Sequence, residues 1–289
     1  MSTHIVTDFH LHGPLLEPCI STHASIKEAL ERLTKEAAEH LQQMGVSAEA
    51  LERIKRCLLS NTQSGNMFRS HTVVQTGLKL CNNACTAHQL SDLRVLVCVV
   101  EFSHAAYCIW DDIMDSSSTR HGQPCWYLQE NVGLMAINDG CLLKSIVSLM
   151  VTKHFMSNPC HVPLIEMLNG AWLRTELGQN ADIMTAAGLV PGLAQFTKQR
   201  YWWIFEHKTA HYSIYLPLAL PFLYLGHATP DILRGLHAVA MVPGLMFQAR
   251  DDFLDVYGSQ GLTGKMGTDI SQNKCTRLAV EAVKRCDER

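Results

Sequence analysis

Two aspartate clusters with one spacing, D-D-x-x-D, constrain this chain more than any other feature. The first occupies residues 111–115 near the middle of the sequence, and the second occupies residues 251–255. On a helix, residues four apart lie on one face, so the outer carboxylates of each cluster point the same way. Like charges on one face repel each other unless a cation neutralises them. Two carboxylate faces pointing at each other would hold Mg²⁺, which usually brings phosphate with it.

Composition indicates a globular protein without a nucleic-acid partner. The chain has 289 residues, of which 47% are apolar and 18% charged, so it can bury a large core and is not disordered. The net charge is −3 and no long run of Lys or Arg occurs, so the electrostatics give nucleic-acid binding no support. The eleven cysteines are scattered without a paired C-x-x-C pattern, which predicts reduced thiols in a cytoplasmic protein.

The sequence predicts neither a membrane span nor a secretion signal. The longest uninterrupted apolar candidate, residues 214–225, contains Pro217 and Pro221 and is shorter than the roughly 18–20 residues that a span needs. The N-terminus has no basic segment ahead of an apolar stretch, and it carries Asp8. We therefore expect a cytoplasmic protein with no membrane-spanning segment.

Helical periodicity dominates the chain, and strand signals are scarce. The segments expected to be helical are residues 24–59, 90–110, 134–155, 162–187 and 231–257. Residues 90–110 are apolar nearly all round, as in a central buried helix. Pro191 is placed to open a further helix, and residues 258–267 hold four glycines and should form a loop. We predict an all-α fold, a single helical bundle that forms one domain over residues 1–289.

Cationic and polar residues near the clusters suit diphosphate chemistry. Breaking a C–O bond to diphosphate creates a highly charged leaving group, which metal ions and fixed cations must stabilise. Candidate groups for this role are Arg120, Lys208, Thr209, Gln248, Lys265 and Lys274. The sequence has no P-loop, no G-x-G-x-x-G motif and no Ser-His-Asp elbow, so a nucleotide is not the implied phosphate donor. A single cluster could be a solvated acidic helix end, but two clusters after long apolar helices favour a metal site.

Five segments resemble the trans-isoprenyl diphosphate synthases, specifically the farnesyl diphosphate synthase branch. They are residues 111–127, 176–182, 208–217, 247–258 and 264–275, in the family's order and spacing. The resemblance implies an isoprenoid synthase fold with a central active-site cavity, whose mouth lies between the two clusters. It also implies a homodimer, and family members continue through several helices beyond the point that corresponds to Arg289. We therefore expect this chain to lack those C-terminal helices.

The same resemblance implies roles for individual residues. Asp111 and Asp115 would hold two Mg²⁺ ions and Asp251 a third, which makes three ions in all. Asp112 and Asp255 would support these ligands. Arg120, Lys208 and Lys265 would bind the diphosphate of the allylic substrate, and the residues completing that site would be Thr209, Gln248 and Lys274. The catalytic residues would be Asp111, Asp115, Lys208 and Asp251.

The second diphosphate site of the family, which binds isopentenyl diphosphate, is altered here. Family members use the Lys and Arg of G-G-K-x-x-R, a Gln seven residues before the first Asp, and the second Arg of T-R-R-G. The corresponding residues are Asn66, Arg69, His104 and His121. Asn has no charge, and His is mostly neutral near pH 7 and lacks the planar fork of Arg. Because losing one buried charge partner typically costs about 2–5 kcal/mol, isopentenyl diphosphate should bind far more weakly.

An enzyme that ionises an allylic diphosphate without a second substrate lets the cation cyclise, lose a proton or capture water. The pattern resembles the insect-type terpene synthases, so we expect a class I terpene synthase that converts farnesyl diphosphate, or the smaller geranyl diphosphate, to a terpene. The alternatives are a working prenyltransferase and an inactive or truncated partner of one. Ala106 should deepen the cavity, and the aromatic residues that could face carbocations are Tyr107, Trp110, Trp202, Trp203 and Phe205.

Overall fold

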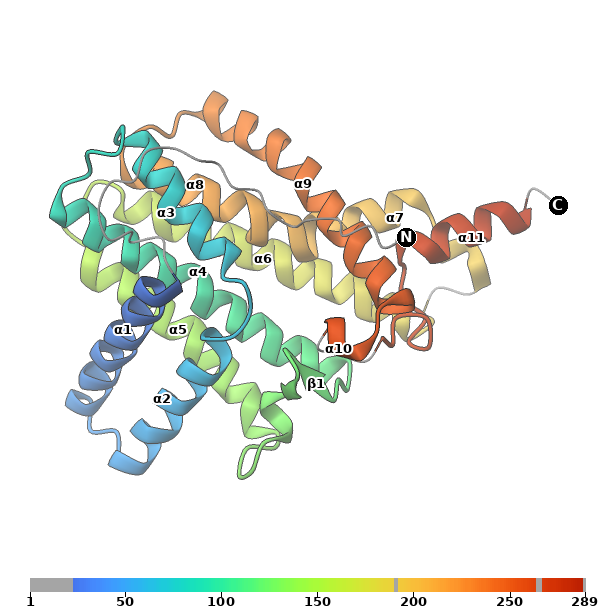
Figure 1. The fold of residues 1–289 in the computed structure, drawn as a ribbon, viewed down its shortest axis with the longest axis horizontal. Coiled ribbons are helices and arrows are strands. Elements are labelled where there is room, and N and C mark those ends of the chain that lie inside the picture. The colour runs from blue at the N-terminus through green and yellow to red at the C-terminus, as the bar shows by residue number, and fades with distance from the viewer. Residues whose placement is uncertain (1–22, 190–191, 264–266, 288–289) are drawn as a thin grey trace, which may run out of the picture.

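The computed structural model describes residues 23–189, 192–263 and 267–287, and this part of the chain is a bundle of helices (Figure 1). The α-helices are α1 (His23–Gln43), α2 (Ala48–Thr62), α3 (Phe68–Leu80), α4 (Ala87–Met114), α5 (Met135–Phe155), α6 (His161–Ala186), α7 (Lys198–Ile204), α8 (Leu216–Tyr224), α9 (Pro230–Tyr257), α10 (Gln260–Thr263) and α11 (Arg277–Asp287). A π-helix, η3 (Phe205–Tyr215), joins α7 to α8, and 3-10 turns lie at η1 (Trp126–Leu128) and η2 (Gly192–Gln195). The only sheet in the described residues is a hairpin of β1 (Thr119–Arg120) and β2 (Gln123–Pro124).

Helix α4 runs through the middle of the bundle and carries the first aspartate cluster in its last turn (Figure 1). A capping box of Thr86 and Gln89 fixes its start, since each side chain accepts a hydrogen bond from the other residue's backbone N–H. Its apolar side chains, such as Phe102 at 0% exposure, form the core with residues of α1, α3, α5 and α6. The predicted central buried helix is therefore confirmed.

Two local predictions differ from the structure, and a third falls on a residue outside the described ranges. Residues 24–59 form two helices, because the chain turns at Gly45 with a positive φ of 87° and Ser47 caps α2. Residues 258–267 contain the short helix α10 within the expected loop. Pro191 lies outside the described residues, and the helix expected after it, α7, begins at Lys198 with Thr197 as its cap.

The π-helix η3 places Lys208 beside the first cluster. It packs so closely against α6 that only a glycine fits at position 178. A Cβ on Gly178 would lie 2.2 Å from the backbone nitrogen of Lys208. The wider turns of a π-helix are rare and occur often at functional sites. The sequence pattern did not predict this element, because residues 205–215 have no clear apolar face.

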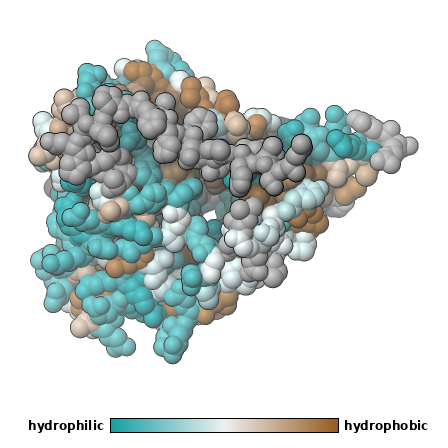
Figure 2. Space-filling view, viewed as in Figure 1, coloured by the Kyte–Doolittle hydropathy of each residue, from teal (hydrophilic) through white to brown (hydrophobic). Residues whose placement is uncertain are grey.

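Three helices are long and apolar enough to cross a membrane by length and composition alone: α4, α5 and α9. The buried share of their most apolar windows is 78% in α4, 44% in α5 and 11% in α9. Apolar side chains gather along the upper edge of the face in Figure 2, over α9, where Val242 and Met246 are exposed. Counting only uninterrupted apolar runs missed these helices, so the absence of a membrane span stays a prediction.

Candidate active site

One cavity of about 840 Å³ collects residues from several elements of the bundle. Its lining comes from α3, α4, β1, α6, α7, η3, α9 and α10 and from the segment between α10 and α11. Figure 2 shows the face hollowed near its centre, between the part carrying α1 and α2 and the part carrying α9. Both aspartate clusters reach this cavity, as the family resemblance implied.

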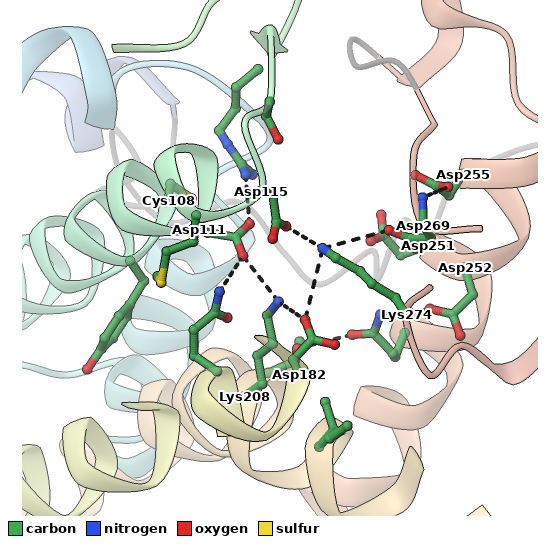
Figure 3. Close-up of a pocket in the computed structure, with 18 of the residues that line it drawn as sticks. Cys108, Asp111, Asp115, Asp182, Lys208, Asp251, Asp252, Asp255, Asp269 and Lys274 are labelled. Carbon is green, nitrogen blue, oxygen red and sulfur yellow. Dashed lines mark hydrogen bonds and ion pairs between the residues drawn. The ribbon is translucent and has the colours of Figure 1, made fainter. Parts of the chain in front are cut away.

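The first cluster enters the cavity through Asp111 and Asp115, which lie in a network of cations (Figure 3). The carboxylate of Asp111 is 3.1 Å from Lys208 Nζ and 3.0 Å from Arg120 Nη2. Asp115 forms an ion pair with Lys274, which comes from the far side of the cavity. Asp112 is 3% exposed and does not line the cavity, because it accepts hydrogen bonds from Arg120 Nε at 2.8 and 2.9 Å. Its position fits the supporting role predicted for it.

Asp182 on α6 is a member of this network that the sequence analysis did not assign. Its carboxylate accepts a hydrogen bond from Lys208 Nζ at 2.5 Å and lies 4.0 Å from Lys274 Nζ. Gln179, three residues earlier on the same helix, donates to Asp111 at 3.1 Å. The segment 176–182 carried the family resemblance, so its polar residues were a usable signal.

The second cluster lies opposite the first, on α9 (Figure 3). Asp252 is 1% exposed and accepts hydrogen bonds from Gln248 Nε2 at 2.8 Å and from the backbone N–H of Arg277 at 2.6 Å. Asp255 accepts from the backbone N–H groups of Thr268 and Asp269 at 3.3 and 2.9 Å. These two carboxylates therefore tie the segment after α10 to α9, which positions that segment at the cavity.

Asp251 and Asp269 also line the cavity, where they face Lys274 (Figure 3). Asp269 comes within 3.9 Å of Lys274 Nζ and is a second carboxylate that the sequence analysis did not assign. Thr209 Oγ1 donates to Gln248 Oε1 at 3.0 Å, so these two predicted diphosphate ligands are also adjacent. Lys265 lies outside the described residues, and its predicted role stays a prediction.

We call Asp111, Asp115, Asp182, Lys208 and Lys274 the allylic corner of the cavity. Burial raises the pKa of Asp111, but the charge of Lys208 and the other nearby cations outweigh it and hold that pKa well below its ordinary value. Burial and the charge of Asp111 raise the pKa of Asp115 against the opposing charge of Lys274. Burial lowers the pKa of Lys208, but the surrounding carboxylates outweigh it and keep the lysine protonated.

The carboxylates suit Mg²⁺, although they do not form a ready-made cage. Within the described ranges, no three His, Cys, Asp or Glu side chains are grouped as a metal site. Lys208 and Lys274 lie between the carboxylates instead. Mg²⁺ requires oxygen ligands and is usually bound by one or two carboxylates together with waters and substrate phosphates. Asp111, Asp115 and Asp251 therefore fit ions that arrive with a diphosphate, whose charge would give the lysines new partners.

The residues predicted for the second diphosphate site line the same cavity, and we call them the second corner: Asn66, Arg69, His104 and His121. Arg69 is 9% exposed, and its Nη2 and Nε donate to Ser213 Oγ at 2.8 and 3.2 Å. Its guanidinium also lies 5.4 Å from the ring centre of Tyr212. Arg69 is the one cationic residue of the family pattern at these four positions, and its guanidinium already contacts Ser213 and Tyr212.

The two histidines of the second corner are neutral near pH 7. Burial, together with nearby arginines, lowers the pKa of both His104 and His121. His104 Nδ1 lies 3.2 Å from the hydroxyl of Tyr212. The ring of His121 packs against Gly65, where a Cβ would come within 3.2 Å of it. This corner therefore offers aromatic and neutral polar groups in place of paired cations.

The aromatic predictions are partly confirmed. Tyr107, Trp110 and Phe205 line the cavity. Trp202 and Trp203 do not line it and are each 41% exposed, because they project from α7 on the other side of the helix. Ala106 packs in the buried core at 1% exposure and also lies outside the lining, so the expectation that it deepens the cavity was wrong.

Comparison with known proteins settles the family. Residues 51–289 match the family model described as polyprenyl synthetase. The chain belongs to the polyprenyl synthetase family. It is 36% identical over 267 residues to the farnesyl pyrophosphate synthase of Schizosaccharomyces pombe. The matched region covers 92% of this chain and 77% of that protein. It is 38% identical over 240 residues to the farnesyl pyrophosphate synthase of Gallus gallus, covering 82% of this chain and 65% of the relative.

Solved structures agree with the sequence relatives. A T. brucei farnesyl diphosphate synthase complexed with a bisphosphonate matches with a TM-score of 0.84 at 28% identity, over 91% of this chain and 78% of that one. The predicted all-α isoprenoid synthase fold is therefore confirmed. The relatives' names agree with the prenyltransferase alternative better than with a terpene synthase, so the terpene synthase subtype is not shown. The extent of the domain and the missing C-terminal helices stay predictions.

Proposed function

We propose that this protein is a Mg²⁺-dependent enzyme that ionises an allylic prenyl diphosphate. The observation that carries the proposal is the allylic corner, where Lys208 and Lys274 meet three carboxylates opposite Asp251 in one cavity. The departure of a diphosphate needs fixed cations and metal ions, and carboxylates are the groups that hold Mg²⁺. Kinship with farnesyl pyrophosphate synthases supports the same substrate class.

Each part of the cavity has a task in that reaction. Mg²⁺, when bound, would neutralise the charge that develops on the leaving diphosphate. Lys208, Lys274 and Arg120 would donate hydrogen bonds to the diphosphate oxygens and hold it in place. Asp182 would keep the two lysines aimed at the site, because it contacts both. The rings of Tyr107 and Phe205 would shield the carbocation from water.

Prenyl transfer is the first candidate for the step that follows ionisation. The relatives are farnesyl pyrophosphate synthases, and the chain matches them across most of its length. In this reaction the allylic cation is captured by isopentenyl diphosphate, and the chain grows. The altered second corner would then bind that substrate through Arg69 and the aromatic rings around it.

Terpene formation is a second candidate, favoured by a specific observation. Asn66, His104 and His121 stand where the family pattern has Lys, Gln and Arg, and Arg69 is engaged with Ser213. A diphosphate entering this corner would meet few available charges, so an allylic cation formed alone would cyclise, lose a proton or capture water. Farnesyl diphosphate is the expected substrate of such a sesquiterpene synthase, and geranyl diphosphate the smaller option.

One assay separates these outcomes. Purified protein with Mg²⁺ is given farnesyl, geranyl or dimethylallyl diphosphate, each alone and then with isopentenyl diphosphate. Released diphosphate is measured, and products are identified by gas chromatography–mass spectrometry before and after phosphatase treatment. Elongation that requires isopentenyl diphosphate supports prenyl transfer, and terpenes from the allylic substrate alone support the second candidate. If no substrate releases diphosphate, the proposed function is wrong and the inactive-partner alternative gains support.

We further propose that the active form is a cytoplasmic homodimer. Apolar side chains are exposed on the neighbouring helices α5 and α6, including Met135 at 53% and Leu173 at 58%. Exposed apolar side chains on neighbouring helices are a common feature of subunit interfaces. Sedimentation of the purified protein over a range of concentrations tests this, because a monomer at every concentration would contradict it.

A further inference from the structure

The second corner of the cavity contains a polar pair that the ionisation step does not use, His104 on α4 and Tyr212 on η3. We propose that His104, oriented by Tyr212, is the base that takes a proton from the carbocation formed in this cavity. This inference rests on the second candidate of the proposed function, terpene formation, because the family pattern has Gln at this position and prenyl transfer in that family needs no imidazole there.

Position along α4 is the first argument. His104, Cys108, Asp111 and Asp115 follow one another at steps of four, three and four residues, so they share the face that lines the cavity. His104 precedes Asp111 by seven residues, which is two helical turns, or about 10 Å along the axis. A diphosphate held at Asp111 therefore leaves His104 beside the hydrocarbon part of the substrate.

Hydrogen bonding gives the imidazole a defined orientation. A neutral imidazole has one N–H donor and one nitrogen lone pair. Nδ1 lies 3.2 Å from the Tyr212 oxygen, and when Nδ1–H donates to that oxygen, Nε2 keeps the lone pair. Cys108 Sγ, which also lines the cavity, lies 3.5 Å from Nε2 and 3.6 Å from Nδ1. A thiol is a weak hydrogen-bonding group, so the lone pair of Nε2 is left available.

Tyr212 is itself held in place, which makes it a suitable positioning residue. Its ring centre lies 5.2 Å from that of Tyr107 and 5.4 Å from the guanidinium carbon of Arg69. Burial raises the pKa of the Tyr212 phenol, so it stays a neutral hydroxyl. The pair is thus anchored from α3, α4 and η3 at once.

The charge state of His104 suits the task. Burial and the charges of Arg69 and Arg120 lower its pKa, so the ring enters the reaction without a proton. The same effects make it a weak base, but a carbocation is a far stronger acid than an imidazolium ion and can protonate it. A neutral imidazole also cannot repel the cation electrostatically, as the Arg or Lys of a second diphosphate site would.

The step balances without another reactant. A C–H bond next to the cationic carbon breaks, and its electron pair forms the new carbon–carbon double bond. The proton moves to Nε2, so the positive charge passes from the hydrocarbon to the ring. The diphosphate already released carries the compensating negative charge, and the proton returns to it or to water when the product leaves.

The test compares His104→Gln and Tyr212→Phe with wild type under the conditions in which wild type releases diphosphate. The amide of Gln cannot accept a proton from a carbocation at a useful rate, and Phe keeps the ring but loses the orienting hydroxyl. Products are dephosphorylated where needed, and the ratio of proton-loss products to water-captured alcohols is determined per diphosphate released. His88→Gln is the matched control, because that side chain is 83% exposed on the same helix.

We expect the ratio to fall at least fivefold in His104→Gln, to fall less in Tyr212→Phe, and to stay unchanged in His88→Gln. An unchanged ratio in His104→Gln with continued diphosphate release would overturn the assignment while leaving the proposed function intact. If wild type releases no diphosphate, the proposed function fails and this assignment fails with it. Melting curves are recorded for each variant to check that it folds. If His104→Gln does not fold, an unchanged product ratio in Tyr212→Phe overturns the proposal that Tyr212 orients His104 as the base.

Discussion

The two corners of the cavity hold similar numbers of polar residues but treat charge in opposite ways. In the allylic corner, Lys208 and Lys274 bridge carboxylates from α4 and α6, and every charge has an oppositely charged neighbour. In the second corner, Arg69 is bound to a serine hydroxyl and lies over a tyrosine ring, and both histidines are neutral. The first arrangement can exchange its ion pairs for a metal and a diphosphate, whereas the second has little charge to offer a diphosphate.

This difference teaches where selectivity resides in such a cavity. Ionisation of the allylic substrate depends on the allylic corner and is common to both candidate reactions. The fate of the cation depends on the second corner, where three side chains depart from the family pattern. Perturbing each corner separately should therefore affect different steps of the reaction.

The largest effect is expected from Lys208→Ala in the allylic corner. Removing one fixed donor to a developing charge typically costs about 10²–10³ in rate, so diphosphate release should fall by at least that factor. Asn66→Ala in the second corner is the comparison, and it should change allylic ionisation less than about threefold, because no charge is lost. Diphosphate release under single-substrate conditions measures both, and equal losses would show that the corners are not functionally separate.

A second test restores charge to the second corner. The triple variant Asn66→Lys, His104→Gln and His121→Arg should raise elongation with isopentenyl diphosphate by at least about 30-fold, given about 2–5 kcal/mol for a buried charge partner. Product chain length after phosphatase treatment measures this gain. The single variant Asn66→Gln, which adds no charge, is the control. A triple variant that elongates no better than wild type would mean that these positions do not limit prenyl transfer.

The sequence predicted which charged residues belong to the site better than it predicted which ion pairs they form with one another. The D-D-x-x-D spacing predicted that Asp111 and Asp115 share one helix face. The family resemblance implied that the two clusters face one cavity, and Asp111, Asp115 and Asp251 all line it. The pattern could not show that Lys274, far along the chain, pairs with Asp115, since that contact depends on how the segment after α10 folds back. Asp182 was missed although residues 176–182 carried the family resemblance, and the π-helix was missed because residues 205–215 have no clear apolar face.

Metal and diphosphate should stabilise the allylic corner together rather than singly. The carboxylates of the allylic corner already form ion pairs with lysines. Mg²⁺ alone is therefore expected to raise the melting temperature by less than about 2 °C, within ordinary salt effects. Mg²⁺ with inorganic diphosphate, at a concentration about 100 times the dissociation constant, should increase the free energy of unfolding by about 2.7 kcal/mol. The melting temperature should then rise by about 5–10 °C. Differential scanning fluorimetry measures both shifts, with Ca²⁺ and diphosphate as the control. A full shift with Mg²⁺ alone would contradict the exchange of ion pairs.

The smallest expected effect is a change in how stability depends on pH, and it belongs to the second corner. Because the pKa of His121 is lowered in the folded state, the unfolded chain binds its proton first as the pH falls below about 6.5. His121 therefore makes stability decline from that pH down to its folded pKa, by at most about 1.4 kcal/mol per pH unit. His121→Asn should flatten this part of the curve in urea unfolding between pH 7 and 5, whereas Asn66→Gln, which removes no titratable group, should follow wild type. A His121→Asn curve parallel to wild type would show that this ring is protonated as readily in the folded chain as in the unfolded one, and the second corner would then carry positive charge at mildly acidic pH.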